Sequence, residues 1–320
     1  MSTIIEFKDV SKAYPDQPTI LVGLNLKIQQ GEIFVLVGPS GSGKTTSLKM
    51  INGLIQPTTG TIDFAGRPMA SYDLRKLRWQ IGYVLQQIAL FPTMTVRQNI
   101  SVIPEMLGWK RARQDREVVR LLKMVDLDPD QYQDRYPREL SGGEQQRIGI
   151  LRALIAEPEV ILMDEPFSAL DPISRTSLQD LVLRLHQELQ TTIVFVTHDM
   201  REALKLADRV GVIHEGELLQ VGTPQEIVEH PATAFVGSFF EGETGSEPHD
   251  FQVADLITAG KYSVDLFQTD LPVVTPTVPA QTLFGLLTRY EMLQVNDQTG
   301  KVLGSLSRQD VFDFLSDRFA

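Results

Sequence analysis

The sequence contains no cysteine among its 320 residues. Disulfide bonds and cysteine-ligated metal centres are therefore excluded, and the composition fits a reducing compartment. The chain also lacks any apolar run of roughly 18 residues, the length that a helix needs to span a bilayer. Its first residues, Met1–Glu6, show neither the basic nor the apolar region of a secretory signal. We therefore expect any role at a membrane to depend on a partner protein.

Positive charge is scarce, because 30 Lys and Arg residues are outnumbered by 41 Asp and Glu residues and the formal net charge is −11. Nucleic-acid binding depends on Lys and Arg contacts to phosphates, so this balance predicts no nucleic-acid partner. Arg111, Arg113 and Arg116 form a small basic patch, which we interpret as a solvated helix face. Hydrophobic residues make up 42% of the chain, enough for a globular protein with a sizeable core.

Short apolar strands alternate with longer helical stretches from residue 4 to about residue 240, which predicts an α/β domain with a largely parallel sheet. Buried strands are expected at Ile33–Val37, Val160–Met163 and Thr192–Thr197, and antiparallel strands at Ile4–Lys8, Leu24–Ile28 and Thr61–Phe64. The polar segment Gly242–Asp250 is typical of a linker. We predict a domain over 1–240, a linker over 241–250 and a smaller unit over 251–320.

The segment Gly38–Thr45 has the phosphate-loop pattern between a predicted strand and a predicted helix. Its glycines allow successive backbone N–H groups to turn inward and bind an anion, and the helix N-terminus adds partial positive charge. Lys44 would reach the β- and γ-phosphates of ATP, and the Thr45 hydroxyl would bind Mg²⁺. The alternative is a glycine-rich turn without a ligand. The predicted ATP-binding residues of this segment are Gly38, Pro39, Ser40, Gly41, Ser42, Gly43, Lys44, Thr45 and Thr46.

Two acidic residues, Asp164 and Glu165, follow the predicted strand Val160–Met163. A carboxylate at the end of an apolar strand is costly unless it meets a cation, so Asp164 is the candidate that holds Mg²⁺. Glu165 is the candidate that polarises the attacking water. The alternative is a pair of acids that simply opens a loop.

The segment Leu140–Arg147 (LSGGEQQR) is a second glycine-rich helix start, in which the Ser141 hydroxyl and the Gly143 N–H could bind phosphate oxygens. Ser141 and Glu144 also have the spacing of a capping box, a purely structural alternative that is compatible with the first. This segment strongly resembles the signature motif of ATP-binding cassette (ABC) proteins. On that resemblance the chain is identified as an ABC protein, and the likeness covers about residues 3–240.

Four further positions match the ABC family. Gln86 resembles the glutamine that links Mg²⁺ and water to the membrane partner, and Asp171 the acid of the loop that crosses the dimer interface. His198 resembles the histidine that contacts the γ-phosphate. Tyr14 resembles the aromatic residue that stacks on adenine, with packing in the core as its alternative.

The resemblance implies a P-loop NTPase fold with a mixed-sheet core, an antiparallel β subdomain and a helical subdomain near 77–137. It implies ATP hydrolysis with Glu165, His198, Gln86 and Lys44 as catalytic residues, and Mg²⁺ bound by Thr45, Gln86 and Asp164. In this family each ATP lies between the phosphate loop of one cassette and the signature of another. Because the chain holds one cassette, the resemblance implies a homodimer with the signature residues acting in trans, namely Ser141, Gly142, Gly143 and Glu144.

The segments 85–92 and 103–109 resemble the ATPases that import glycine betaine, carnitine and choline. This likeness implies an integral membrane permease, an extracytoplasmic solute-binding protein and a peripheral location at the cytoplasmic face of the membrane. The solute is inferred from this likeness alone, because the permease and the binding protein, and not the cassette, select the solute in this family. The alternatives are an importer for another small solute, such as an amino acid or a polyamine, and a soluble ABC ATPase outside transport.

Residues 251–320 resemble a single cystathionine-β-synthase (CBS) module, which is a small α+β unit. In such modules the pattern that Ser307 and Asp310 match can hold the ribose of an adenine nucleotide. The structural alternative is a helix cap with a favourable charge in the first turn. With one module instead of a tandem pair, we favour an interaction or dimerisation role over nucleotide sensing.

Overall fold

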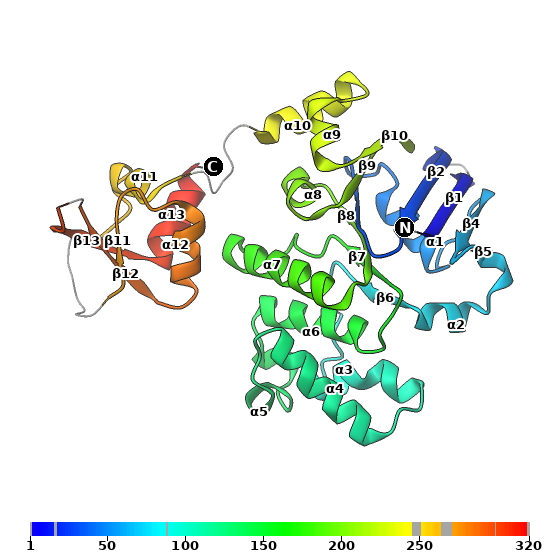
Figure 1. Cartoon of the computed structure of the whole chain (residues 1–320), viewed down its shortest axis with the longest axis horizontal. Coiled ribbons are helices and arrows are strands. Elements are labelled where there is room, and N and C mark those ends of the chain that lie inside the picture. Colours follow the sequence, from blue (N-terminus) through cyan, green and yellow to red (C-terminus); the bar gives the residue numbers. More distant parts are fainter. Residues whose placement is uncertain are drawn as a thin grey trace. The chain divides into compact units, whose positions relative to one another are not determined.

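The computed structural model describes residues 2–15, 18–87, 89–244, 251–263, 271–297 and 299–318. The chain folds into two compact units, Met1–Glu241 and Gly242–Ala320 (Figure 1). The predicted linker over 241–250 lies mostly outside the described residues. Among the helices of the described ranges, none combines the length with the apolar character that a membrane crossing requires.

The first unit is built on a six-stranded sheet in the order β10-β9-β3-β8-β7-β6. The sheet is mixed, because β10 runs antiparallel to β9 while the other neighbours are parallel. Successive side chains in a strand point to opposite faces, so Val35 packs in one hydrophobic core and Phe34 in the other. The strands are β3 (Ile33–Val37), β6 (Ile81–Val84), β7 (Val160–Asp164), β8 (Thr192–Thr197), β9 (Arg209–His214) and β10 (Glu217–Gly222).

A second sheet of four strands has the order β2-β1-β4-β5 and is antiparallel, as the sequence predicts. Its strands are β1 (Thr3–Lys12), β2 (Leu21–Gln29), β4 (Thr59–Phe64) and β5 (Arg67–Pro68). Its apolar side chains, such as Phe7, share one core with Phe34 of β3 and Leu48 of helix α1 (Lys44–Ile51). Helix α1, which follows the phosphate loop, is thus fixed by packing on both sheets.

The opposite face of the central sheet is covered mainly by helices, whose apolar residues form the other core with β3, β7 and β8. The helical group between β6 and β7, from α3 to α6, overlaps the region near 77–137 where the sequence predicts a helical subdomain (Figure 1). Within it, α3 packs on both α4 and α6. The remaining helices of this unit are α2 (Leu74–Trp79), α3 (Val96–Met106), α4 (Arg111–Met124), α5 (Pro129–Tyr132), α6 (Gly142–Leu154), α7 (Pro172–Leu189), α8 (Met200–Leu206), α9 (Pro224–Glu229) and α10 (Ala234–Thr244), with short 3₁₀ turns at Met69–Ser71 and Pro137–Glu139.

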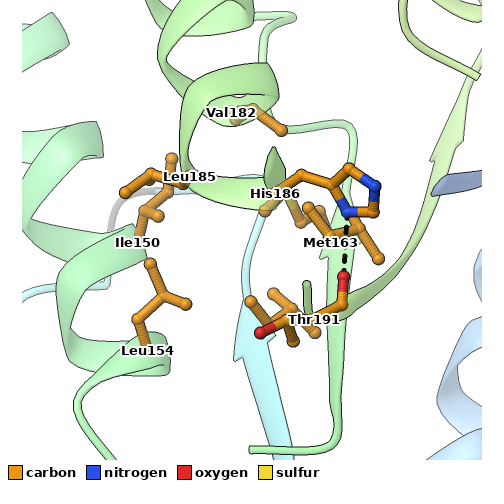
Figure 2. Close-up of a pocket in the computed structure, with 9 residues that line it drawn as sticks. Ile150, Leu154, Met163, Val182, Leu185, His186 and Thr191 are labelled. Atoms are coloured by element: carbon orange, nitrogen blue, oxygen red, sulfur yellow. Dashed lines mark hydrogen bonds between the residues drawn. The ribbon is translucent and has the colours of Figure 1, made fainter. Parts of the chain in front are cut away.

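A cavity of about 10 Å³ lies in the core between α6, α7 and the sheet (Figure 2). Apolar side chains such as Leu154, Met163 and Val182 line it. His186 closes one side, with its Nδ1 atom 3.0 Å from the carbonyl oxygen of Thr191. This volume holds no more than about one water molecule, so the cavity is a packing gap and not a ligand site.

The second unit contains a three-stranded sheet in the order β11-β12-β13. Strand β11 (Val273–Val274) is parallel to β12 (Met292–Asn296), and β12 is antiparallel to β13 (Val302–Ser307). Its helices are α11 (Val253–Thr258), α12 (Ala280–Leu287) and α13 (Arg308–Arg318). The unit is therefore an α+β arrangement, as predicted from the sequence, and its likeness to a CBS module stays a prediction.

Candidate functional site

The order of the strands places the predicted site residues at one edge of the central sheet. The phosphate loop follows β3, the loop at His198 follows β8, Glu165 follows β7 and Gln86 comes just after β6. These four strands are consecutive neighbours and run parallel. Their carboxyl ends therefore meet at the same edge, where ligands of parallel sheets bind.

Lys44, at the start of α1, folds back over the phosphate loop. Its ammonium group donates hydrogen bonds to the carbonyl oxygens of Gly38 at 2.7 Å and Pro39 at 2.8 Å. Burial lowers the pKa of Lys44, and the negative charges of Glu165 and Asp164 oppose that shift. The loop therefore encloses a cation that is 5% exposed, a position suited to an incoming phosphate group.

Two features of the phosphate loop show that the backbone, and not side-chain bulk, shapes it. A Cβ atom at Gly38 would lie 2.0 Å from the carbonyl oxygen of Ile213, so no larger residue fits there. Gly43 has a φ of 102°, in the region that favours glycine.

Among the described residues, the buried hydroxyl of Ser42 has no hydrogen-bond partner. A buried unpaired hydroxyl is unusual, and a phosphate oxygen in this loop would supply a partner.

Asp164, the last residue of β7, meets the helix that follows the phosphate loop. The Thr45 hydroxyl donates a hydrogen bond of 2.9 Å to Oδ1 of Asp164, which is buried. The Tyr83 side chain lies beside this pair, and burial together with the charge of Asp164 raises the pKa of the Tyr83 hydroxyl. Sequence reasoning missed Tyr83, because a tyrosine in a strand resembles any core aromatic residue.

Two predicted residues, Gln86 and His198, converge on the carboxylate of Glu165. Its Oε2 atom lies 3.2 Å from Nε2 of Gln86 and 3.3 Å from Nδ1 of His198. Its backbone has a φ of 44°, which is rare for a residue other than glycine. The Glu165 N–H donates to the carbonyl oxygen of Val196 at 3.1 Å, which holds this strained turn against β8.

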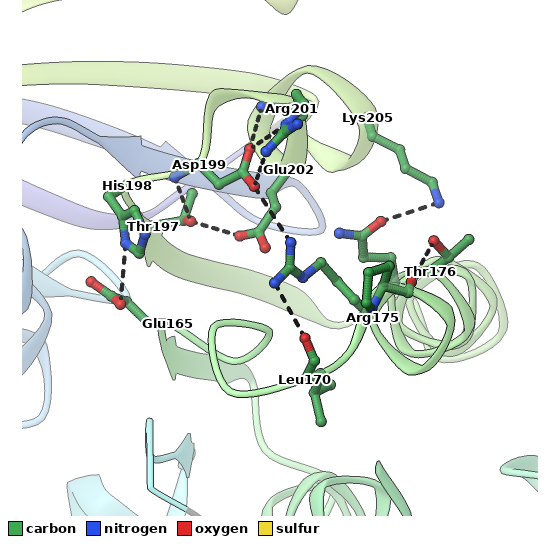
Figure 3. Close-up of polar contacts among 12 residues, drawn as sticks. Glu165, Leu170, Arg175, Thr176, Thr197, His198, Asp199, Arg201, Glu202 and Lys205 are labelled. Carbon is green, nitrogen blue, oxygen red and sulfur yellow. Dashed lines mark hydrogen bonds and ion pairs between the residues drawn. The ribbon is translucent and has the colours of Figure 1, made fainter. Parts of the chain in front are cut away.

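The turn that carries His198 rests on a buried acid that sequence reasoning missed. Glu202 of α8 is 4% exposed, and its carboxylate accepts a 2.6 Å hydrogen bond from the Thr197 hydroxyl (Figure 3). Burial raises the pKa of Glu202 to about 7, while the bond from Thr197 and the charges of Arg175 and His198 oppose the rise. A charged residue on the inner face of a short helix was the only sequence signal for it.

The signature segment forms the start of α6 and lies at the surface. The Ser141 hydroxyl accepts from the Glu144 N–H at 3.3 Å, and the Glu144 carboxylate accepts from the Ser141 N–H at 2.7 Å. The capping box is therefore formed, and Gly142 is exposed beside it. Within the described chain, no hydrogen bond joins these residues to the phosphate loop.

Asp171 and Tyr14 occupy different surroundings. Asp171 caps α7 by accepting from the N–H groups of Ile173 and Ser174. Burial raises the pKa of Asp171, but hydrogen bonds from the Ser174 side chain and from these N–H groups outweigh burial and leave the pKa below its ordinary value.

The Tyr14 ring is 37% exposed, with the Lys12 ammonium 4.6 Å from its centroid, so it lies outside the hydrophobic core.

Comparison with known proteins identifies the class. Residues 21–168 match the ABC transporter family. The chain is 43% identical over 97% of its length to a glycine betaine/carnitine/choline transport ATP-binding protein of Bacillus subtilis, of which it covers 84%. It is 52% identical over 75% of its length to a choline transport ATP-binding protein of the same organism, of which it covers 63%.

A solved structure shows the same cassette fold. The chain superposes with a TM-score of 0.61 and 31% identity on an ATP-binding cassette solved as a dimer in a post-hydrolysis state with ADP and Pi, covering 69% of this chain and 99% of that one. The first unit is therefore an ABC cassette with the P-loop NTPase fold. The chain belongs to the family of ABC transporter ATP-binding proteins, and it is an ATPase.

Proposed function

We propose that this chain is the motor subunit of an importer for a quaternary-amine osmoprotectant, such as glycine betaine, carnitine or choline. The observation that carries the hydrolytic role is the convergence of Gln86 and His198 on one oxygen of Glu165. The solute is proposed from the likeness to the two Bacillus subtilis proteins, whose names refer to the transport of these compounds.

ATP would bind over the phosphate loop. Lys44 would exchange the carbonyl oxygens of Gly38 and Pro39 for the β- and γ-phosphates, and the backbone N–H groups of residues 40–46 would cradle the phosphate oxygens. The Ser42 hydroxyl would gain the partner that it lacks among the described residues. The exposed ring of Tyr14 would stack on adenine, for which an accessible face is required.

The residues present fit Mg²⁺. Thr45 and Asp164 offer a hydroxyl and a carboxylate oxygen 2.9 Å apart at the edge where the phosphates would lie. Mg²⁺ prefers such hard oxygen ligands and takes its others from phosphate and water. Gln86 would add a ligand from the neighbouring loop. When bound, the ion would neutralise charge on the transferred phosphoryl group.

Glu165 would polarise the attacking water, since its carboxylate stands at the edge of the sheet between Gln86 and His198. His198 would contact the γ-phosphate and keep Glu165 in place. The strained backbone at Glu165 fixes the direction of the carboxylate before ATP arrives.

The active form would be a homodimer. The signature residues Ser141–Glu144, of which Ser141 and Gly142 are exposed, would meet the ATP held by the other copy, and their N–H groups would complete the electrostatic cradle in trans. Asp171, at the start of α7, would lie in the loop that crosses between the copies. Closure on ATP and release after hydrolysis would then drive the partner.

The partner would be an integral membrane permease docked on the helical subdomain, with an extracytoplasmic solute-binding protein reached through it. The chain would be peripheral, at the cytoplasmic face of the membrane. Phe91, which is 45% exposed, lies in the loop after Gln86 that would take part in this docking.

For the tail, we propose a CBS-like module that pairs with its copy in the dimer. Ser307 and Asp310, the candidate adenine-nucleotide contacts, are already bonded to each other. The Ser307 hydroxyl donates to the Asp310 carboxylate at 2.6 Å and accepts from the Asp310 N–H at 3.2 Å. This reciprocal cap accounts for the pair without a nucleotide, which supports dimerisation over sensing.

The solute is tested by uptake of radiolabelled glycine betaine into cells that have or lack this chain, with the permease present. We expect uptake only with the intact chain, and competition by choline or carnitine. Competition by an amino acid or a polyamine instead would assign the other solute class. A chain that never co-purifies with a permease would support a soluble ABC ATPase.

A further inference from the structure

Two loops that leave neighbouring strands lie on either side of Arg175. The first, Ser168–Asp171, leads from Glu165 into α7 and is named here the 168–171 loop. The second, Thr197–Asp199, begins at the last residue of β8 and is named the histidine loop. Arg175 stands in the first turn of α7 and reaches toward both (Figure 3).

The guanidinium of Arg175 contacts one group from each loop. Its Nη2 atom donates a 3.2 Å hydrogen bond to the carbonyl oxygen of Leu170. Its Nη1 atom lies 4.0 Å from Oδ2 of Asp199, the residue after His198. Among the described residues, the buried Nε atom has no hydrogen-bond partner. The planar fork of arginine is suited to hold a carbonyl and a carboxylate together, whereas a lysine ammonium offers a single point charge.

Hydrogen bonds hold the histidine loop on both sides of His198. The Thr197 hydroxyl donates to the buried Glu202 and accepts from the Asp199 N–H at 3.0 Å. Asp199 also caps α8 by accepting from the Arg201 N–H at 3.0 Å. His198 is therefore held between two fixed residues, one of which faces Arg175.

We propose that Arg175 is a positioning residue that couples the 168–171 loop to His198. A second cassette that shifts the Leu170 carbonyl would shift the guanidinium, and through Asp199 the imidazole beside Glu165. The buried Nε without a partner fits a side chain that has not reached its final contacts in the single chain. This inference rests on the proposed roles of His198 and of the dimer, and it goes beyond them by naming the link within one chain.

The test compares Arg175→Met with Arg184→Met in the full-length protein. Arg184 lies on the same helix and pairs with the exposed Asp126 at 2.8 Å, so its loss removes an arginine of α7 away from both loops. We expect Arg175→Met to lower kcat by about tenfold to a hundredfold, as misplacement of a catalytic group does. The KM for ATP should stay within about twofold, because binding of ATP is not the step affected.

A double-mutant cycle with His198→Ala separates coupling from general damage. If Arg175 acts through His198, Arg175→Met adds no further loss of single-turnover rate in the His198→Ala background. The coupling is overturned if the losses of single-turnover rate from the two substitutions multiply in the double mutant. It is also overturned if Arg175→Met has the same kcat as Arg184→Met. Either result leaves the role of His198 intact. Normal turnover of His198→Ala alone would refute both.

If Arg175→Met does not fold, the Asp199→Asn variant tests the same coupling. Asparagine keeps the capping oxygen of α8 but removes the charge that faces Arg175. If the coupling exists, Asp199→Asn lowers kcat as much as Arg175→Met is expected to. In the His198→Ala background, Asp199→Asn then causes no further loss of single-turnover rate. A wild-type kcat in Asp199→Asn would overturn it.

Discussion

Nδ1 of His198 lies 3.3 Å from Oε2 of Glu165, although 32 residues of sequence, including all of helix α7, lie between these two residues. Glu165 directly follows strand β7, and His198 directly follows strand β8. The contact exists because β7 and β8 are parallel neighbours, with Asp164 opposite Val196. Helix α7 returns the chain so that both strands end at the same edge.

Replacing Glu165 by Gln should trap ATP. The amide keeps the size of the side chain but cannot act as a base, so hydrolysis should fall by about 10²–10⁴-fold while binding persists. Size-exclusion chromatography with ATP and Mg²⁺ should then show a stable dimer. Glu188→Gln, at an exposed site on α7, is the matched control and should hydrolyse normally. Survival of hydrolysis in Glu165→Gln would show that another group is the base.

Replacing Ser141 by Ala should separate capping from catalysis. Ser141 and Thr223 both form complete capping boxes, at α6 and α9. Each alanine variant should lose about 1 kcal/mol of unfolding free energy, measured by urea denaturation. Only Ser141→Ala should also lose hydrolysis, by about tenfold or more, because its hydroxyl would serve the ATP of the second copy. Equal activity of the two variants would leave Ser141 with a structural role alone.

Replacing Gly38 by Ala should disrupt the phosphate loop. The new Cβ would collide with the Ile213 carbonyl oxygen, and both a shifted backbone and weaker ATP binding should follow. Gly66→Ala is the control, because its φ of 74° carries the backbone strain of about 1–2 kcal/mol without any collision. We expect Gly38→Ala to lower the free energy of unfolding by about 1–3 kcal/mol more than Gly66→Ala does, as measured by thermal denaturation. Similar melting temperatures and similar binding of a fluorescent ATP analogue would contradict this.

Glu202 should make the stability of the cassette depend on pH. In the folded protein the Glu202 carboxyl faces Thr197, Asp199, Arg175 and His198. Burial raises its pKa from the ordinary value of 4.5 to about 7, so the carboxyl keeps its proton up to about pH 7. The unfolded chain loses the proton at lower pH, so unfolding is favoured as pH rises from about 4.5 to 7.

The variant Glu202→Gln should remove this part of the pH dependence. Relative to the variant, the natural chain should lose roughly 2 kcal/mol of unfolding free energy between pH 5 and pH 8. Urea denaturation at several pH values measures the slope, with Glu217→Gln as a control at an exposed site. Parallel pH curves for Glu202→Gln and the natural chain would show that Glu202 does not titrate in this range.

Much of the site was predictable because its motifs are local. The phosphate loop and the signature each combine a loop with a helix start, so their residue order alone specifies the backbone that can bind phosphate. The strands Ile33–Val37 and Thr192–Thr197 coincide with β3 and β8 because each contains a continuous apolar run, and both strands are buried throughout. Glu202 and the contacts of Arg175 were not predictable, since they join residues from different elements.

The sequence by itself determined the chemistry of this protein: a glycine-rich anion site, a pair of acids after a buried strand, and no cysteine to add a disulfide or thiolate site. Only the tertiary structure decided which of these groups meet. The order β3-β8-β7-β6 brings Lys44, His198, Glu165 and Gln86 to one edge, because parallel strands lie about 4.8 Å apart and end side by side. That order depends on how the helices pack on the two faces of the sheet, a long-range property that no single segment contains.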